Sequence, residues 1–186
     1  MTKPKILAHI CCAPDAIYVI NLLQNDYDVT GFFSNSNIWP EEEYIKRLGE
    51  TRKVERILGF ELLEDVYDAG RWLRAVEKFK AEPEKGRRCD ICYALRLESS
   101  ARKAAALGIP VFTTIISLSP WKKAEVLNRI GRRIGRKHHL AFLEANFKKK
   151  GGFAKSIDLS RRYGLYRQNY CGCIYSLRKD APAPPK

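Results

Sequence analysis

The chain of 186 residues is long enough for one domain with a substantial core, and its hydrophobic content of 45% is ordinary for a globular protein. Its longest apolar runs are too short to span a bilayer, so we expect no membrane partner. The net charge of +13 excludes an acidic protein, and most of it falls in the C-terminal third.

The excess of positive charge lies in two segments. Residues 121–137 hold seven Lys or Arg against one Glu, a balance of +6, and residues 147–186 hold ten against two Asp, a balance of +8. The remainder of the chain is therefore near neutral, at −1. This concentration predicts a polyanionic partner, with nucleic acid first; a solvated basic face kept for solubility is the alternative.

Short apolar runs alternate with longer amphipathic stretches along the whole chain. The expected strands are 5–10, 27–34, 60–66, 111–117 and 140–143, and the expected helices are 14–25, 41–58, 70–80, 89–107, 120–137 and 153–162. Pro14 and Pro120 suit the first turns of their helices, and Gly59 ends the long one. Residues 148–152 are expected to form a flexible basic loop.

This order of elements predicts a single α/β domain over residues 1–180, with a mainly parallel sheet of about five strands flanked by helices. The tail, 181–186, is rich in proline and alanine and is expected to be disordered. The chain contains neither a G-x-G-x-x-G sequence nor a P-loop, so a nucleotide-dependent mechanism is not supported.

All six cysteines occur as close couples: Cys11 with Cys12, Cys89 with Cys92, and Cys171 with Cys173. The first couple lies between a predicted strand and a predicted helix, which is where open α/β sheets bind ligands. In the second couple, the i, i+3 spacing places both thiols on one face of a helix. Because thiolates bind metals, we predict that the three couples meet at one place and hold metal there.

The number of sulfurs bears on the kind of metal site. A 4Fe-4S cluster takes four protein ligands, so six thiolates suffice for a cluster and a second metal, particularly if Asp15 or Asp90 also binds. Adjacent side chains in extended backbone point to opposite faces, so Cys11 and Cys12 are expected to serve two metal centres.

Other uses of these cysteines stay open. The N-terminus shows no secretory signal, which predicts a cytoplasmic location and disfavours disulfides. A structural zinc site and a dithiol redox centre at Cys89 and Cys92 are the remaining alternatives.

Several motifs together resemble one known family, the QueH type of epoxyqueuosine reductase, from Lys5 to about Leu177. The matching segments are His9-Ile10-Cys11-Cys12-Ala13-Pro14, Gly31-Phe32-Phe33 with Asn37-Ile38 and Glu43-Tyr44, Arg88-Cys89-Asp90-x-Cys92-Tyr93-x-x-Arg96-Leu97, Thr113-Thr114 with Ser119-Pro120, and Gly164-Leu165-Tyr166-Arg167-Gln168-Asn169-Tyr170-Cys171-Gly172-Cys173.

The resemblance implies an adenine nucleotide hydrolase-like (HUP-like) fold and an enzyme of queuosine biosynthesis. Such an enzyme removes the epoxide oxygen of epoxyqueuosine at the wobble position of tRNA without cobalamin. The implied cofactors are a 4Fe-4S cluster with three cysteine ligands and one aspartate, and a neighbouring mononuclear iron. The implied partners are tRNA carrying epoxyqueuosine and an electron donor of the ferredoxin or flavodoxin type.

By motif position, the metal and cofactor ligands would be Cys11, Cys12, Asp15, Cys89, Cys92, Cys171 and Cys173. Asp15 is preferred to Asp90 as the carboxylate, although many relatives have cysteine at position 15. The segment 119–123 departs from the usual family ending, and no catalytic role is placed there.

Residues near the cysteine couples are candidates for the proton donor: His9, Tyr93 and Tyr170. His9 has an alternative role as a hydrogen-bonded core residue, and Tyr93, Tyr166 and Tyr170 could instead stack on anticodon-loop bases or pack in the core. Candidate phosphate contacts are Arg87, Arg88, Arg167 and lysines 148–150. Two rival functions remain: a zinc-stabilised RNA-binding module, and another iron–sulfur enzyme of tRNA modification such as a sulfur transferase.

Overall fold

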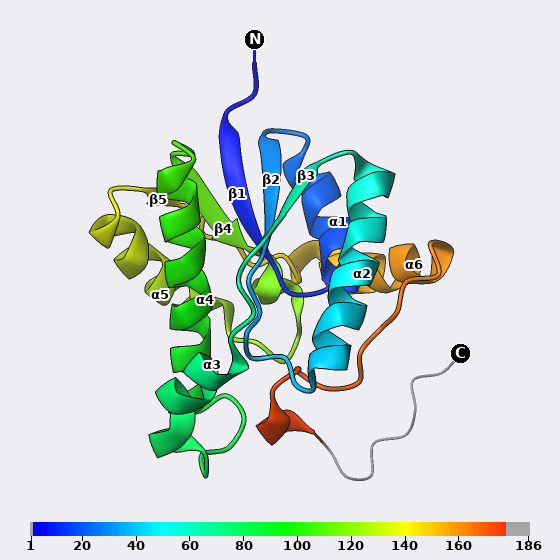
Figure 1. Ribbon diagram of the computed structural model, residues 1–186. Helices are drawn as coiled ribbons and strands as arrows, with labels where there is room; N and C mark the ends of the chain where they lie inside the picture. The colour runs from blue at the N-terminus through cyan, green and yellow to red at the C-terminus, as the bar shows by residue number, and fades with distance from the viewer. Residues whose placement is uncertain (1, 178–186) are drawn as a thin grey trace.

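Five parallel strands form one sheet in the order β3-β2-β1-β4-β5 in the computed structural model, which describes residues 2–177 (Figure 1). The strands are β1 (Lys5–Ile10), β2 (Asp28–Phe33), β3 (Glu61–Glu64), β4 (Val111–Thr114) and β5 (Ala141–Phe142). β1 lies at the centre, and residues 6–10 are all buried. Parallel strands covered on both faces read as continuous apolar runs, which is why this segment was recognisable.

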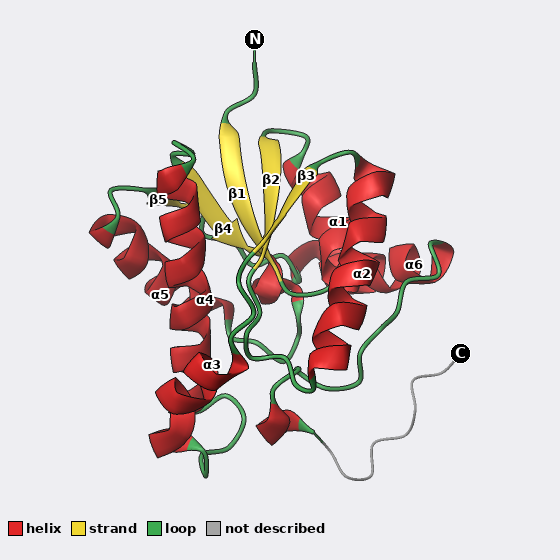
Figure 2. Ribbon diagram, in the orientation of Figure 1, coloured by secondary structure: helices red, strands yellow, loops and turns green. Residues whose placement is uncertain are grey.

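Helices cover both faces of the sheet, as Figure 2 shows. They are α1 (Ala13–Leu23), α2 (Glu41–Leu58), α3 (Ala69–Val76), α4 (Arg87–Ala106), α5 (Ala124–Lys137) and α6 (Gly152–Arg162). The helices α1, α2 and α6 form one layer, and α3, α4 and α5 form the other (Figure 1). The predicted α/β architecture with a five-stranded parallel sheet is confirmed.

The core is divided by the sheet, because successive strand residues face opposite sides. Ile6, Ala8 and Ile10 pack in a cluster with residues of α1, whereas Leu7 packs in a second cluster with Leu97 of α4. Each layer of helices thus covers its own apolar face of β1.

The strand order creates a topological switch point beside β1. The chain moves from β1 to β2 and β3 on one side, and later returns to place β4 on the other side. Ligands bind at the carboxyl ends of strands that diverge in this way. Cys11 and Cys12 follow β1 directly, and the C-terminal segment 164–177 passes the same end of the sheet (Figure 1).

Three local predictions on the second half are wrong. The strand expected at 111–117 ends at Thr114, whose hydroxyl accepts a hydrogen bond from the Ile116 N–H at 3.3 Å and starts a 3₁₀ turn. The helix expected from Pro120 begins at Ala124, since Ser119 and Pro120 belong to a preceding turn. The loop expected at 148–152 contains a 3₁₀ turn, and α6 already starts at Gly152.

The apolar residues of α2 predict one buried face, and the observed face differs from it in part; the expected residues are Tyr44, Ile45, Leu48, Val54, Ile57 and Leu58. Ile45 and Ile57 are exposed, at 59% and 40%, while Arg47 and Thr51 are buried. The reason is tertiary, because Arg47 reaches carbonyl groups of the C-terminal segment. The predicted disordered tail, 181–186, lies outside the described residues.

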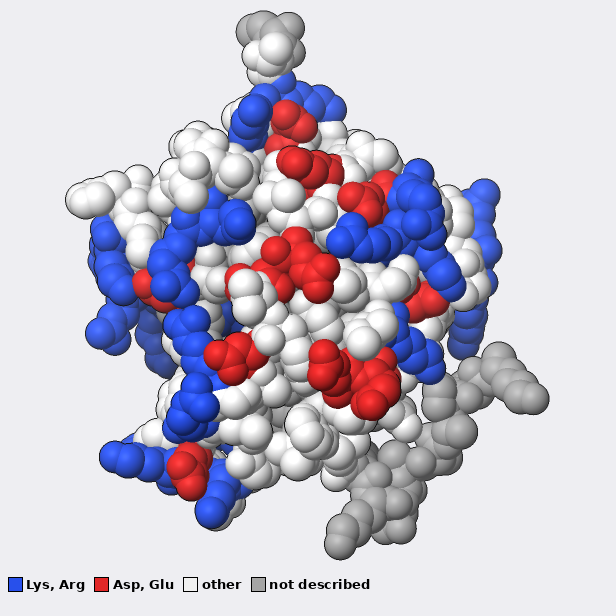
Figure 3. Space-filling view, viewed as in Figure 1, with Lys and Arg blue, Asp and Glu red and all other residues white. Residues whose placement is uncertain are grey.

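The surface is strongly charged. Figure 3 shows Lys and Arg along the margins of one face, over α4 and α5 and over α2 and α6, with acidic side chains between them. Within residues 2–177, no helix is both long and apolar enough to cross a membrane.

Candidate metal and redox site

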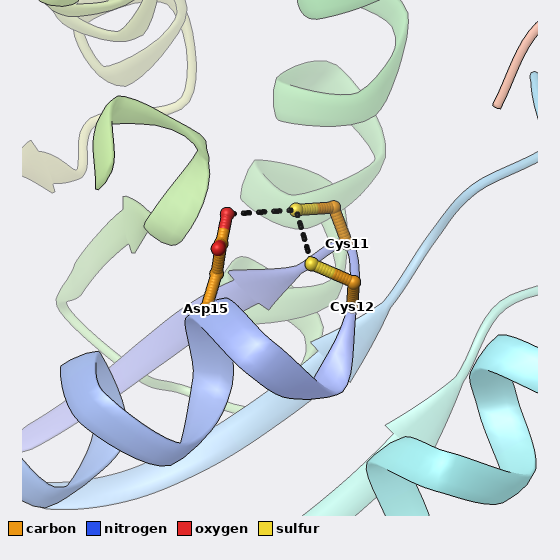
Figure 4. Close-up of side chains that lie close together, drawn as sticks. All are labelled: Cys11, Cys12 and Asp15. Carbon is orange, nitrogen blue, oxygen red and sulfur yellow. Dashed lines mark hydrogen bonds between the residues drawn. The ribbon is translucent and has the colours of Figure 1, made fainter. Parts of the chain in front are cut away.

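Cys11, Cys12 and Asp15 form a compact group of metal-ligating atoms, all within 4.8 Å of one another (Figure 4). The two sulfurs are 3.8 Å apart, and Cys11 Sγ is 4.0 Å from Asp15 Oδ2. The expectation that the neighbouring thiols point to opposite faces is therefore wrong. The chain turns from β1 into α1 at this point, and Asp15 in the first turn of the helix completes the group.

The electrostatics of this group favour one thiolate. The hydrogen bond from Cys11, aided by the Asp15 backbone and by Gln168, outweighs burial and lowers the pKa of Cys12 to about 6. The bond to Cys12 and burial raise the pKa of Cys11, and burial together with the Cys12 charge raises that of Asp15. Since a thiolate is the form that binds metal, Cys12 is prepared for ligation near neutral pH.

The second couple lies in the first two turns of α4, and the fold brings it to the other two. Cys92 packs in one cluster with Cys173, and Cys11 packs against a cluster that contains Cys89. The buried Arg96 guanidinium is within electrostatic reach of Cys11, Cys92 and Cys171, and these charges hold its pKa above its ordinary value despite burial. All three couples therefore gather around Arg96 at the carboxyl edge of the sheet.

Burial sets the protonation of the second couple. It raises the pKa of Cys89 and of Cys92, although nearby cations oppose it in both cases. The Lys85 backbone N–H donates a hydrogen bond to Cys89 Sγ at 3.3 Å. A backbone N–H donor of this kind stabilises the thiolate form of the sulfur, which is the form that a bound metal requires.

The third couple is held in a loop by contacts from distant elements. Arg47, with a side chain only 2% exposed, donates to the carbonyl oxygens of Tyr170 and Cys171 at 3.3 and 3.2 Å. Gly172 has a φ of 122°, and its carbonyl accepts a bond from the Trp39 N–H at 2.8 Å. A Cβ there would lie 3.0 Å from Arg47 Nη1, so glycine between the two cysteines lets the loop close on α2.

A cavity of about 630 Å³ opens at these groups. Cys11, Asp15 and Cys171 contribute to its wall. Five cationic side chains also line it, and these are Arg47, Lys85, Arg96, Lys122 and Arg167. A site with this lining can hold metal on its thiols and attract a polyanionic substrate with its cations.

Lys122 is a functional candidate that the sequence analysis missed. Its Nζ lies 3.1 Å from Cys171 Sγ and 2.8 Å from Glu84 Oε1, and its side chain is only 8% exposed. Burial lowers the pKa of Lys122, but the charges of Cys171, Tyr93 and Glu84 outweigh this effect and raise it overall. The sequence did offer a signal for Lys122. It follows Ser119-Pro120 by two residues, in the segment after β4, and β4 pairs with β1.

The three candidate proton donors occupy very different positions. His9 is fully buried: its Nε2 donates to the Ser34 carbonyl at 3.1 Å, and its Nδ1 is 3.0 Å from the Thr114 hydroxyl. Burial and the Arg96 charge lower the pKa of His9 to about 3, so it is neutral and joins β1 to its neighbours. Tyr93 is buried beside Cys89 and burial raises its pKa, whereas Tyr170 is half-buried and lines the cavity.

The structure also distinguishes among the predicted phosphate contacts and between the two candidate carboxylate ligands. Arg167 lines the cavity, but Arg88 is buried and its guanidinium donates to the carbonyl of Lys80 at 2.8 Å. Because its charge is turned inward, Arg88 is not placed to contact phosphate. Asp90 belongs neither to the compact ligand group nor to the cavity wall, whereas Asp15 belongs to both.

The fold and the site together define an α/β protein whose cysteines and one buried carboxylate form a site suited to metal at the carboxyl edge of a parallel sheet. A search of known structures returns the same fold in a protein described as a predicted subunit of tRNA methyltransferase from Methanocaldococcus jannaschii. The TM-score is 0.57 at 10% identity, over 86% of this chain and 76% of that one.

The chain belongs to the QueH family, because the family model for epoxyqueuosine reductase QueH matches residues 6–179. Curated relatives of that name agree with this assignment. The proteins from Streptococcus pyogenes and Haemophilus influenzae are 34% and 36% identical to it, over 95% and 94% of this chain and 71% and 72% of their own lengths. The protein from Thermotoga maritima is 35% identical over 92% of this chain and 90% of its own length.

Proposed function

We propose that this chain is an epoxyqueuosine reductase that converts epoxyqueuosine at the wobble position of tRNA to queuosine. The observation that supports the proposal most directly is that the three cysteine couples lie near one another, beside a cavity lined by Cys11 and Cys171, in a member of the QueH family. The reaction breaks both C–O bonds of the epoxide and forms a C=C bond. It consumes two electrons and two protons and releases one water.

The residues present fit a 4Fe-4S cluster with a second iron. Thiolate sulfur is the ligand that such clusters require, and Asp15 adds an oxygen donor. We assign Cys11, Cys12, Asp15, Cys89, Cys92, Cys171 and Cys173 as the residues that hold these groups. When bound, the cluster would supply electrons one at a time, and the second iron would supply a Lewis acid.

The spacing of the ligands supports two kinds of metal position. Cys11, Cys12 and Asp15 are the one group in residues 2–177 with three ligand atoms close enough for a single ion. The ligands of a cluster bind different irons, so their sulfurs lie farther apart than those on one ion. The other four cysteines belong to no such compact group within residues 2–177, which agrees with that requirement.

The cations of the cavity would bind and orient the substrate. Arg167 and Lys85 line the cavity wall and can contact phosphates of the anticodon loop. Arg96 and Lys122 are buried, so their charges act mainly on the cysteine thiolates. This division predicts that substitution of the first pair weakens tRNA binding, and that substitution of the second pair alters the metal site.

Tyr170 is the candidate proton donor that the geometry supports best. It is the one of the three predicted acids that lines the cavity, and its hydroxyl donates to the Trp39 carbonyl at 2.5 Å. Burial and Glu43 raise the pKa of Tyr170 to about 12, so its hydroxyl stays protonated at neutral pH. We expect Tyr170→Phe to lower the rate while leaving the iron content unchanged.

The decisive experiment uses protein purified without oxygen and tRNA that contains epoxyqueuosine. With a low-potential chemical reductant, digested tRNA should show a nucleoside lighter by one oxygen atom. Iron and acid-labile sulfide measured on the same sample identify the metal. A colourless zinc protein that binds tRNA without changing it would refute the proposal, and a sulfur-containing product would identify a sulfur transferase instead.

A further inference from the structure

Trp121 is an aromatic side chain of the cavity wall that carries Cys11 and Cys171, and it is 66% exposed. It lies in the turn between β4 and α5, where its backbone N–H contacts the Ser119 hydroxyl at 3.4 Å. A large apolar surface left in water costs free energy unless something covers it. We infer that Trp121 is a stacking platform for an unpaired base of the tRNA anticodon loop; this inference rests on the proposed function.

Charge complementarity identifies the occupant as nucleic acid. The Lys85 ammonium lies 5.5 Å from the centre of the Trp121 ring, and the exposed Lys123 follows Trp121 by two residues. Lys148 donates to the Lys122 carbonyl at 2.6 Å, which places the Lys148 side chain beside the same turn. An aromatic face bordered by cations is how proteins bind single-stranded nucleic acid, with the base on the ring and the phosphates on the cations.

The tyrosines first considered for stacking are less available than Trp121. Tyr93 is only 4% exposed. Tyr166 and Tyr170 are only partly exposed, and their hydroxyls are held by Glu43 and by the Trp39 carbonyl respectively. Trp121 therefore offers the largest exposed aromatic surface on the cavity wall.

The position of Lys85 links this platform to the cysteine site. Its φ is 74°, a left-handed conformation that is unfavourable for a residue with a side chain. The same residue donates its N–H to Cys89 Sγ at 3.3 Å and extends its ammonium toward Trp121. A base stacked on Trp121 would thus be held next to the cavity. The wobble nucleotide beside that base would then enter the cavity.

The test measures binding of an anticodon stem–loop RNA to the holoprotein by fluorescence anisotropy. For Trp121→Ala we expect the Kd to rise about tenfold or more, as stacking on aromatic side chains predicts. Trp121→Phe should recover part of the loss, because it keeps a π face. Tyr163→Ala is the matched control, since Tyr163 is also exposed, at 41%, but does not line the cavity, and it should bind normally.

A second measurement identifies the stacked base. A series of stem–loops carries an abasic nucleotide at one loop position each. At the position of the stacked base, the abasic change should weaken binding to the wild-type protein but should not weaken binding to Trp121→Ala any further. In turnover, Trp121→Ala should raise KM with little change in kcat. Lys85→Met should reduce the slope of log Kd against log salt concentration by the amount expected for about one phosphate contact.

The outcomes separate this inference from the proposed function. If the wild-type protein binds the stem–loop and Trp121→Ala binds it equally well, the inference is wrong and the reductase proposal is untouched. If the wild-type protein binds no form of the RNA, the proposed function fails and the inference fails with it. Because Trp121 is exposed, the substitution should leave the thermal unfolding curve unchanged, which circular dichroism verifies.

Discussion

The two ends of the sheet carry cavities of the same volume, about 630 Å³ each, and their chemistry is entirely different. The cavity at the amino end is lined by the starts of β1 and β2 and by neighbouring turns, with the charged side chains of Lys3, Lys5 and Asp28 in solvent. The cavity at the carboxyl end is lined by thiols, Asp15 and the buried cations Arg96 and Lys122.

The difference shows that cavity volume does not identify the site. Burying a charge is costly unless partners compensate it, so buried cations next to thiols indicate a place where negative charge is expected. At the amino end, charged groups remain hydrated and nothing requires a ligand. Function is therefore expected at one end only, and substitutions at the two ends should have different consequences.

The largest effect is expected for Cys171→Ser at the carboxyl end. Loss of this proposed metal ligand should remove most bound iron and lower reductase activity by more than ~100-fold, beyond the effect usual for residues that only support ligands. Iron analysis and product analysis of the tRNA provide the measurement. Lys5→Ala, at the amino end, is the control; if it lost iron to the same extent, the contrast between the two ends would be wrong.

Phe60→Ala should show that the amino end has a structural role. Phe60 is 7% exposed and packs in the main core cluster. Its truncation should lower the free energy of unfolding by about 3–5 kcal/mol, measured by urea denaturation. Activity for each folded, iron-loaded molecule should remain normal, and a selective loss of activity would show that this end also takes part in catalysis.

Substitutions of Asp15 test whether its carboxylate is a ligand. Asp15→Ala should reduce iron content or activity by about 10- to 100-fold, because it removes an oxygen donor from the compact group. Asp15→Cys should retain metal, since a thiolate can replace the carboxylate. Equal iron in the wild type and Asp15→Ala would remove Asp15 from the ligand set.

Lys122→Met should shift the reduction potential of the site. The Lys122 ammonium donates to Cys171 Sγ, and both a positive charge and a hydrogen bond to sulfur favour the reduced, more negative state. We expect the midpoint potential to fall by about 59 mV, a tenfold change for one electron. Lys123→Met, at the exposed neighbouring residue, is the matched control, and equal potentials in all three proteins would contradict this role.

Glu98→Gln should have the smallest effect, because its ion pairs lie away from both cavities. Burial raises the pKa of Glu98, but hydrogen bonds from Lys137 and His138 at 2.7 and 2.9 Å outweigh burial and lower it. The carboxylate should therefore contribute about 0.5–1 kcal/mol above the ordinary pKa of Glu, and this contribution is lost as the pH falls through the lowered value.

Thermal unfolding at several pH values measures the effect. The difference between wild type and Glu98→Gln should be present at neutral pH and disappear in acid. Glu144→Gln, in the more exposed pair with Arg132, is the control. A difference that persisted in acid would show that the contribution of Glu98 is not electrostatic.

Much of the fold was accessible from the sequence because its signals are local. A continuous apolar run identified β1 with its correct ends, and Gly59, which has a φ of 67°, ended α2 where expected. The errors lie where tertiary contacts override local preference. Thr114 ends β4 early by accepting a hydrogen bond, and Arg47 replaces apolar residues on the buried face of α2.

The sequence by itself determined the composition of the site. Cysteine has few uses in a chain of this kind, so three close couples and the motifs around them sufficed to identify the family and to propose the ligands. The tertiary structure alone decided that Cys11 and Cys12 point the same way, that Lys122 contacts Cys171, and that His9 is sealed in the core. These are relations between residues far apart in the chain or across a change of backbone direction, and packing fixes them rather than any local preference.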